Sequence, residues 1–548
     1  MFMNTQNKIK IVILILIIFL AASLRLYKLD QIPPSLNWDE TAGAYNAYVI
    51  ANWARDEWGQ FLPLIFTSFR DDKHPVHVYI TAVVVKIFGL SDFTARLSGA
   101  LVGIFSVLVI YYLAGIFFKN SLAALFSAFF LAVSPYHLQF SRGLWEVNFA
   151  LFFFLLGLLM FYLGIKKKAR LINISFFSFG LSLLSYHSSK VVVPMMVLLL
   201  VVLYFKDLRK LSLNFYTGIF IFLIFITLLF IDPRLVGFAR AKQTQFGQDV
   251  IEKTRIYQKT KNSTLGLAEI ALNQYITHFS LNYLFLYGDQ SPRNSVKTSG
   301  EFYKSDGLFF IAGLLYLIKL RSRVSLVLLF WLLLAPIPSS LVGGAPSATR
   351  AIFMAGSMHL LAGAGAAGIA GLLGKKLKVF VVILILLFVS VQAYFFLGYY
   401  FNAYPKKDPH EWQYGMKQIV EFVKEHEEYD YIFMTDIRSQ SYIFFLYYLK
   451  HPLPEYLNSV VYNNSEESVK YNTVSYFGGY YLGKEGEERR INVYFGGWDP
   501  IESTPDKGRL YVVSPSQYDG LKHRSSFDVK KIIYYPDGGK AFYIVSAT

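Results

Sequence analysis

Long uninterrupted apolar runs are the feature that most restricts how this chain of 548 residues can fold. Residues 11–24, 149–165 and 379–398 contain no charged side chain. Only 16% of all residues are charged, whereas soluble globular proteins have about a quarter. This composition excludes a disordered chain and an ordinary cytosolic enzyme, and runs of this length are typical of membrane-spanning helices. The sequence therefore predicts a polytopic membrane protein.

The positions of the basic residues decide how the predicted spans are oriented. Cytoplasmic loops of membrane proteins carry an excess of Lys and Arg. If the short segment 76–90, which contains Lys86, lies at the membrane interface instead of crossing, the large basic clusters all fall on the cytoplasmic side. About eleven spans then place the amino terminus in the cytoplasm and the carboxyl terminus outside, in a multi-pass protein of the plasma membrane. The predicted spans are residues 9–27, 98–118, 122–137, 149–165, 171–187, 191–205, 215–231, 307–320, 324–342, 351–373 and 379–400.

The net charge of +16 points to the membrane and not to nucleic acid. Many of the excess cations lie in short loops between apolar runs, where they set topology and contact anionic membrane lipids. The chain has no cysteine, which excludes disulfides and thiolate chemistry. Ala21-Ala22-Ser23 could be read as a signal-peptidase site. An uncleaved anchor is favoured, because Arg25 can extend its charge to the outer interface.

Two domains are predicted. Residues 1–400 form a transmembrane domain with two long outer loops, residues 28–96 and 232–305, and the first of these contains a juxtamembrane helix. Residues 401–548 are too polar to span and long enough to fold as an extracytoplasmic soluble α/β domain. Their pattern predicts helices at 411–426 and 441–449 and strands at 431–435, 491–495, 510–513, 531–535 and 541–545.

Acidic residues at the outer ends of spans are the first candidates for chemistry, because placing them near hydrocarbon costs free energy. Asp39 and Glu40 follow the first span closely, and Glu146 lies in a short outer loop four residues after Arg142. Asp39 could simply cap the helix that follows it, and Glu146 could simply pair with Arg142. If neighbouring spans bring Asp39 and Glu146 together, one carboxylate could act as a base and the other could orient an acceptor.

Basic residues accompany these acids on the same predicted face of the membrane. Each could be an interfacial anchor, but several that converge would bind a phosphate, since Arg offers a bidentate fork and Lys a point charge. Lys190 and Arg350 stand out because each lies in a short outer turn at a helix end. The full set is Lys73, Arg96, Arg142, Lys190, Arg240, Arg293 and Arg350.

Evidence for a metal site is weak. His74 and His77 are three residues apart, but the chain has no His-Glu-x-x-His motif and no cysteine ligand. No metal ligands are therefore assigned and no cofactor is predicted with certainty. A divalent metal ion held by Asp39 and Glu146 stays open as an alternative.

The order of several short motifs resembles the polyprenyl-phosphate-sugar glycosyltransferases of the membrane C-type superfamily. Within it, the likeness is closest to the protein O-mannosyltransferase and aminoarabinose lipid A transferase families, and it covers roughly the first 400 residues. Singly these motifs are short, but their order on one membrane face is fairly specific. They are Arg25-Leu26-Tyr27, Pro33, Trp38-Asp39-Glu40, Lys73-His74-Pro75, Phe88-Gly89-Leu90, Ala95-Arg96-Leu97, Glu146 and the stretch from Tyr283-Leu284-Phe285 through Gly288-Asp289 to Arg293.

The resemblance implies a sugar donor linked to undecaprenyl or dolichyl phosphate, an inverting transfer, and catalysis by Asp39. It also implies that segment 76–90 is a juxtamembrane helix. His74-Pro75 matches the mannosyltransferase branch and Lys73 the aminoarabinose branch, so the branch stays open. The tail does not resemble the β-trefoil of eukaryotic mannosyltransferases. The sugar and the acceptor do not follow from the resemblance.

The predicted function is that of a membrane glycosyltransferase of the cell envelope. It would move a sugar from a polyprenyl-phosphate carrier to an extracytoplasmic acceptor, which could be a protein, a lipid or a glycan. The alternative is a transporter or flippase of lipid-linked sugars, although transporters usually bind substrate near the membrane midplane. The predicted site has Asp39 and Glu146 as catalytic residues, Glu40, His74 and Arg142 as supporting residues, and Lys73, Lys190, Arg293 and Arg350 as ligands of the donor phosphate.

Overall fold

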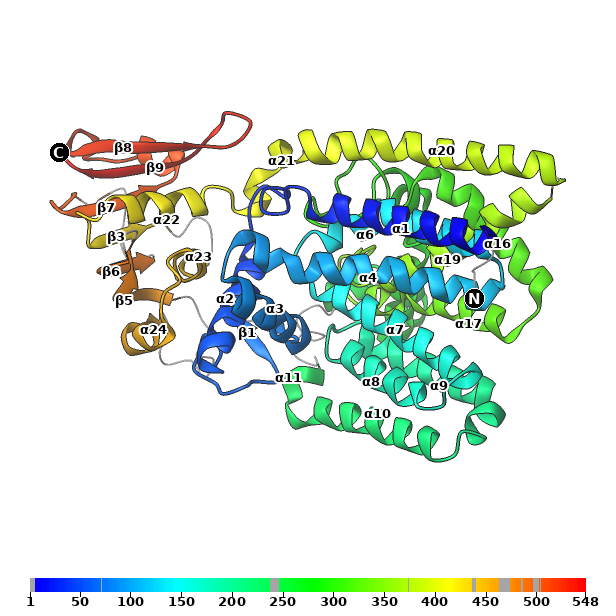
Figure 1. Ribbon diagram of the computed structural model, residues 1–548. Coiled ribbons are helices and arrows are strands. Elements are labelled where there is room, and N and C mark those ends of the chain that lie inside the picture. Colours follow the sequence, from blue (N-terminus) through cyan, green and yellow to red (C-terminus); the bar gives the residue numbers. More distant parts are fainter. Residues whose placement is uncertain are drawn as a thin grey trace. The chain divides into compact units, whose positions relative to one another are not determined.

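The computed structural model describes residues 5–69, 71–236, 246–372, 374–435, 440–462, 474–483, 486–495, 502 and 504–548 (Figure 1). The chain divides into two compact units, each built from two stretches of sequence. The first combines Met1–Tyr27 with Gly99–Tyr400 and is called the helical unit here. The second combines Lys28–Ser98 with Phe401–Thr548 and is called the mixed unit.

Eight helices in the described part of the chain are long and apolar enough to cross a membrane. Each coincides with a segment predicted from the sequence, which confirms a polytopic helical membrane protein. The eight are α1 (Thr5–Leu26), α4 (Asp92–Phe118), α7 (Glu146–Lys166), α9 (Ser189–Arg209), α10 (Leu213–Ile231), α17 (Arg323–Leu334) continued by α18 (Ile337–Ser340), α19 (Phe353–Gly371) and α20 (Lys375–Asn402).

The other three predicted spans correspond to shorter or bent helices. Helices α5 (Ser121–Val133) and α6 (Pro135–Ser141) form a pair bent by 58°. The bend falls where Pro135 has no N–H to donate and where the Ser134 hydroxyl accepts a hydrogen bond from the His137 N–H. Helices α8 (Leu171–Leu183) and α16 (Lys304–Leu320) have 13 and 17 residues.

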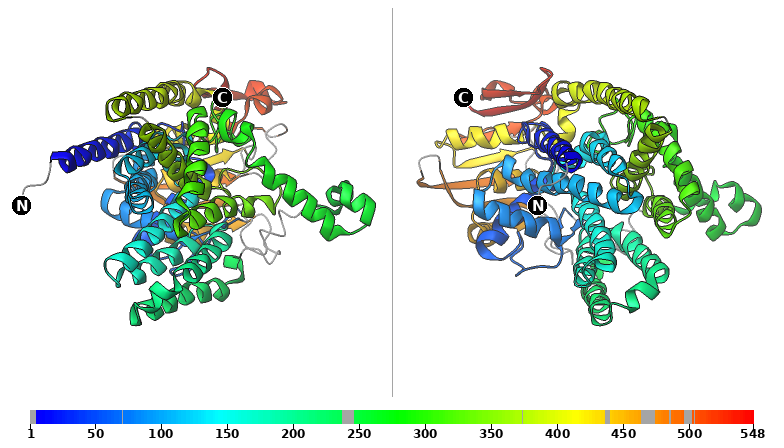
Figure 2. Two further views of the ribbon diagram at one scale, coloured as in Figure 1. Left: turned by 90° about the vertical axis from the view of Figure 1, so that its right-hand side faces the viewer. Right: turned by 45° about the vertical axis from the view of Figure 1, so that its right-hand side comes forward.

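Glycines let helices of the helical unit approach closely. A Cβ atom on Gly313 of α16 would lie 2.0 Å from the Leu361 carbonyl oxygen of α19, and one on Gly363 of α19 would lie 2.1 Å from the Ser127 hydroxyl of α5. Similarly, Gly157 and Gly180 leave room for Phe179 and Phe225, so that α7, α8 and α10 lie side by side (Figure 2). Small residues are a common means of packing helices in lipid.

The second long loop contains short helices that the sequence did not predict. They are α11 (Pro233–Val236), α13 (Gln248–Glu252), α14 (Arg255–Thr260), α15 (Ser263–Thr277) and the π-helix η1 (Asn282–Leu286). Arg25, at the end of α1, also differs from expectation. It is fully buried, and its guanidinium donates to the Ala132 carbonyl and lies 2.8 Å from His137 Nδ1, so it does not extend to the interface.

The first part of the mixed unit is a small helical layer with one hairpin. It contains α2 (Trp38–Trp53), β1 (Phe66–Ser68), β2 (Asp71–Lys73) and α3 (Pro75–Phe88). Strands β1 and β2 are antiparallel, with Phe66 opposite Lys73. Ala47 of α2 packs with Phe66, Val78 and Ala82 in a buried cluster. The predicted juxtamembrane segment is therefore helical, and its place at the interface stays a prediction.

The tail forms an α/β domain, as predicted, around a seven-stranded sheet of order β4-β5-β6-β3-β7-β9-β8. Strand β3 is parallel to β6 and β7, and the remaining pairs are antiparallel. The strands are β3 (Tyr431–Met434), β4 (Val461–Tyr462), β5 (Val474–Leu482), β6 (Glu488–Phe495), β7 (Arg509–Val513), β8 (Phe527–Tyr534) and β9 (Lys540–Ala547). The helices are α21 (Tyr404–Lys407), η2 (Pro409–Trp412), α22 (Met416–Glu425), α23 (Ser441–Tyr448), α24 (Leu453–Ser459), α25 (Pro515–Asp519) and η3 (Arg524–Ser526).

Candidate active site

Asp39 and Lys73 form an ion pair within the mixed unit. Lys73 Nζ lies 2.6 Å from Asp39 Oδ1, with the Lys73 side chain 6% exposed and that of Asp39 33% exposed. Lys73 is the last residue of β2, and its pairing with Phe66 of β1 fixes its backbone. The hairpin thus holds a nearly buried cation against a carboxylate that solvent still reaches.

The start of α2 explains why the Asp39 carboxylate is available for this pair. Asn37, not Asp39, is the N-cap, and its side-chain oxygen accepts hydrogen bonds from the N–H groups of Asp39 and Glu40. The Glu40 carboxylate accepts the Asn37 N–H in return, which completes a capping box. Because Asn37 caps the helix, the Asp39 side chain is not used for capping.

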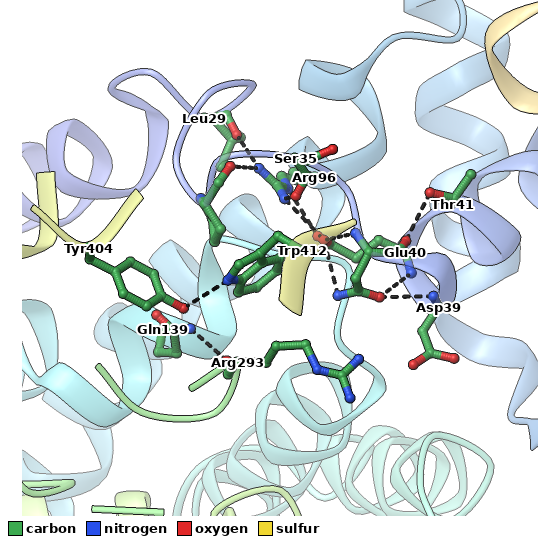
Figure 3. Close-up of polar contacts among 12 residues, drawn as sticks. Leu29, Ser35, Asp39, Glu40, Thr41, Arg96, Gln139, Arg293, Tyr404 and Trp412 are labelled. Atoms are coloured by element: carbon green, nitrogen blue, oxygen red, sulfur yellow. Dashed lines mark hydrogen bonds and ion pairs between the residues drawn. The ribbon is translucent and has the colours of Figure 1, made fainter. Parts of the chain in front are cut away.

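Glu40 and Arg96 form a second ion pair in the mixed unit, and both side chains are fully buried. Arg96 Nε and Nη2 lie 2.9 and 3.0 Å from the two Glu40 oxygens. The same guanidinium donates to the carbonyls of Leu29, Pro33 and Ser35 (Figure 3). Arg96 therefore holds residues 29–35 against the first turn of α2. His74, another predicted supporting residue, is buried at the N-cap position of α3.

Arg142 and Glu146 lie in the helical unit, on either side of a short turn. The buried Arg142 guanidinium donates to the carbonyls of Leu24 and Tyr27, at 2.6 and 2.8 Å. It thereby bonds carbonyls at the carboxyl end of α1, where a cation is favourable. Glu146 is the first residue of α7, where the helix dipole favours a negative charge.

Arg293 belongs to a loop that buried polar groups fix in place. Gln139 Nε2 donates to the Arg293 carbonyl at 2.6 Å (Figure 3). The Asp289 carboxylate accepts from the Ser291 N–H, and also from the Ala348 N–H at 2.7 Å. Asp289 thus connects the loop that carries Arg293 to the turn that carries Arg350.

Glu301 also stabilises the loop that carries Arg293. Its carboxylate accepts the Asp289 N–H at 2.9 Å. Burial, and then the neighbouring charge of Asp289, raise the pKa of Glu301 well above its usual value. Gln139 and Glu301 were not predicted from the sequence. An acidic residue just before the apolar run 307–320 was the one available signal for Glu301.

The remaining predicted phosphate ligands also lie in the helical unit. Lys190 Nζ lies 3.2 Å from His187 Nδ1, and Arg350 Nη1 donates to the Gly343 carbonyl at 2.6 Å. Arg240 lies outside the described residues. In the part of the chain that the structure describes, no group of three or more His, Asp or Glu side chains is placed to hold a metal ion.

The structure thus brings Asp39 together with Lys73, and Glu40 together with Arg96, in the mixed unit. Arg142, Glu146, Lys190, Arg293 and Arg350 belong to the helical unit. The catalytic and binding roles of all these residues, and a single site formed by both units, stay predictions. The division into domains at residue 400 also stays a prediction.

Comparisons with known proteins add to this geometry. Residues 72–231 match the family model of the dolichyl-phosphate-mannose-protein mannosyltransferases. ArnT from Cupriavidus metallidurans, solved bound to undecaprenyl phosphate, is similar in fold over 98% of this chain and 98% of its own, with a TM-score of 0.53 and 14% identity. The family model covers less than a third of the chain, and the likeness to ArnT is one of fold. Both matches agree with the resemblance that the motifs indicated.

Another solved structure matches a smaller part of the chain. The Archaeoglobus fulgidus oligosaccharyltransferase, solved with a tethered acceptor peptide, matches 80% of this chain with a TM-score of 0.47 and 16% identity. The match covers 59% of the archaeal chain, so this chain spans about three fifths of that enzyme. No curated protein matches the sequence.

Proposed function

We propose that this chain is an inverting membrane glycosyltransferase. Its donor is a sugar linked to a polyprenyl phosphate, either undecaprenyl or dolichyl, and its acceptor is an extracytoplasmic protein, lipid or glycan. The observation that carries the proposal is the ion pair between Asp39 and Lys73, which joins a potential base to a potential phosphate ligand. The mannosyltransferase family match and the fold shared with ArnT, which binds undecaprenyl phosphate, support the same donor class.

In the proposed reaction, an acceptor hydroxyl or amine attacks the anomeric carbon of the donor sugar. Asp39 removes the acceptor proton as the new bond forms. The bond between the anomeric carbon and the phosphate oxygen breaks, and its electron pair leaves with the polyprenyl phosphate. Since attack comes from the face opposite the phosphate, the anomeric configuration inverts. Glu146 orients the acceptor.

The leaving phosphate needs cations more than a general acid, because it departs as a stabilised anion. Lys73 offers one charge within the mixed unit, and Lys190, Arg293 and Arg350 offer three from the helical unit. Glu40, His74 and Arg142 hold the surrounding segments in place. A divalent metal ion at Asp39 and Glu146 is not needed for any of these steps.

The proposal includes an orientation. The amino terminus is cytoplasmic, and both Asp39 and the carboxyl-terminal domain lie outside the cell.

The donor sugar can be identified by mass spectrometry of the lipid-linked sugars that accumulate in a deletion strain.

Replacing Asp39 tests the proposed base. Purified Asp39→Asn protein should lose about 10²- to 10⁴-fold in the rate of polyprenyl phosphate release, since that is the usual contribution of a positioned base. The measurement is free polyprenyl phosphate, formed with donor and acceptor present. Asp537→Asn, at an exposed turn of the tail, is the matched control and should keep the parent rate. Equal rates for Asp39→Asn and parent would refute the assignment.

The same assay distinguishes the transferase from a transporter or flippase. A flippase moves the intact lipid-linked sugar and releases no free polyprenyl phosphate. Transport of donor by the parent chain without such release, in sealed vesicles that also contain acceptor, would favour the alternative.

A further inference from the structure

The helical unit contains a cavity of about 390 Å³ that takes no part in the proposed transfer. It lies between the π-helix η1, the first residue of α16 and the last third of α20. Its walls include Phe285, Phe395, Phe396 and Tyr399, and its polar groups include Lys304 and Gln392. None of Lys190, Arg293 and Arg350 lines it.

The walls of this cavity are held by close packing. A Cβ atom on Gly300 would lie 2.3 Å from the Phe285 backbone nitrogen, and one on Gly307 would lie 3.0 Å from the Phe285 ring. The Ser305 N–H donates to Gln392 Oε1 at 3.3 Å, which joins the start of α16 to α20. Phe285 also belongs to a π-helix, a conformation that is frequent at functional sites. The cavity is therefore formed without a ligand.

Side chains around the cavity indicate that it opens at the level of lipid headgroups. Tyr394 and Phe395, near the carboxyl end of the apolar helix α20, are 74% and 71% exposed. Exposed aromatic side chains at the end of a span are typical of the membrane interface. Gln392 is a polar residue within the same span, and such residues usually mark a binding function. The cavity thus combines aromatic walls with polar groups near the end of a span.

Two polar groups at the cavity are without partners in the part of the chain that the structure describes. Lys304 is exposed and forms no ion pair there. The Tyr399 hydroxyl is buried and has no hydrogen-bond partner. A cation and a hydroxyl beside an aromatic wall match a ligand that has one phosphate and an apolar chain.

We propose that this cavity binds one anionic glycerophospholipid of the bilayer, independently of the sugar donor. An acyl chain lies against Phe285, Phe395 and Phe396. The phosphodiester contacts Lys304, and the ester or glycerol oxygens contact Gln392 and Tyr399. A bilayer lipid fits better than the donor, because the cavity offers a single cation and shares no residue with the proposed phosphate ligands.

Native mass spectrometry of the full chain tests the proposal. The probes are palmitoyl-oleoyl phosphatidylglycerol, the matching phosphatidylcholine, and undecaprenyl phosphate. The parent should retain one phosphatidylglycerol about tenfold more tightly than phosphatidylcholine, and Lys304→Gln should abolish this preference. Lys319→Gln, at the other end of α16, is the matched control and should keep it.

Two further variants and one control keep the test decisive if Lys304→Gln folds poorly. Tyr399→Phe removes only a hydroxyl and should weaken phosphatidylglycerol retention several-fold. Phe395→Ser alters an exposed wall residue, whereas Tyr394→Ser alters its exposed neighbour outside the cavity. Only the former should reduce labelling of the cavity by a phosphatidylglycerol that carries a photoreactive acyl chain.

The proposal is overturned if phosphatidylglycerol and phosphatidylcholine bind the parent equally. It is also overturned if labelling falls outside the cavity, or if undecaprenyl phosphate displaces phosphatidylglycerol and Lys304→Gln weakens its binding, since the cavity would then hold the donor. Loss of transferase activity in Asp39→Asn without loss of phosphatidylglycerol binding would support both proposals separately.

Discussion

At the scale of single residues, Glu57 is a buried carboxyl group beside the hairpin that carries Lys73. The Ser68 hydroxyl of β1 donates to it at 2.5 Å, and the Asn46 amide of α2 donates at 3.3 Å. The Tyr442 hydroxyl of the tail lies within 3.4 Å. Burial raises the pKa of Glu57 from 4.5 to about 7. Below about pH 7, this carboxyl group therefore connects three segments of the mixed unit in its protonated form.

The raised pKa of Glu57 predicts how stability depends on pH. The folded protein holds the Glu57 proton more tightly than the unfolded chain does. The contribution of Glu57 to the free energy of unfolding is therefore fully present below pH 4.5 and is lost as pH rises toward about 7. The free energy of unfolding falls by at most about 1.4 kcal/mol per pH unit. In Glu57→Gln, thermal midpoints of the full chain between pH 5 and 8 should decline less than those of the parent.

The control for this prediction is Glu488→Gln, which changes an exposed glutamate in the tail. Its pH dependence should match that of the parent. If Glu57→Gln also declines as steeply as the parent, Glu57 is ionised throughout this range and the prediction is wrong.

At the scale of elements, the first turn of α2 depends on the buried pair of Glu40 and Arg96. Removing one partner of such a pair leaves an uncompensated buried charge, at a cost of about 3 to 5 kcal/mol. Arg96→Met should therefore lower the thermal midpoint strongly, and Arg96→Met combined with Glu40→Met should recover much of the loss. Arg323→Met breaks the exposed pair with Asp207 and should cost at most about 1 kcal/mol.

The double variant makes this prediction specific. If Arg96→Met with Glu40→Met is no more stable than Arg96→Met alone, the loss comes from the bonds of Arg96 to the carbonyls of residues 29–35 and not from the unpaired Glu40.

A second element-scale prediction concerns the loop that carries Arg293. Asp289→Ala removes the acceptor that joins this loop to Ala348, and with it the link between Arg293 and Arg350. Leaving a buried N–H unpaired costs about 1 to 3 kcal/mol. The KM for donor should rise roughly tenfold, with a smaller change in kcat. Glu301→Gln keeps an uncharged acceptor and should stay near the parent, whereas an unchanged KM in Asp289→Ala would contradict this role.

At the scale of the whole molecule, the mixed unit joins two stretches that lie far apart in the sequence. Lys417 of α22 pairs with Asp92 at 2.8 Å, and the Tyr45 hydroxyl of α2 donates to the His451 carbonyl. The Trp38 N–H donates to the Gln413 side chain, directly beside Asp39. The tail therefore helps to hold the segment that carries the proposed base.

The orientation of the chain can be tested because it contains no cysteine. Single cysteines at position 168, in the basic loop after α7, and at position 537, in the tail, occupy exposed sites. A membrane-impermeant maleimide should label Asp537→Cys in intact cells, and Lys168→Cys only after permeabilisation. Labelling of Lys168→Cys in intact cells would reverse the proposed topology.

The sequence by itself predicted the features that depend on local patterns. Apolar runs located the spans, because a helix in lipid must satisfy its own backbone and present apolar side chains. Short runs rich in β-branched and aromatic residues located β3, β6, β7, β8 and β9. They did not locate the two-residue strand β4, or β5, where Gly478-Gly479 interrupts a run rich in tyrosine. Asp39 and Lys73 were chosen from motifs, although no local pattern showed that a hairpin would place them 2.6 Å apart.

Only the tertiary structure decided which candidate residues pair with one another. Asn37 caps α2, Arg96 is buried against Glu40, and Arg142 bonds the end of α1, so cations that looked equivalent in the sequence have different environments. Glu57, Gln139 and Glu301 showed no signal in the sequence strong enough to select them. The physical reason is that burial and pairing arise from contacts between segments that are tens to hundreds of residues apart, whereas sequence periodicity reports only the environment along one element.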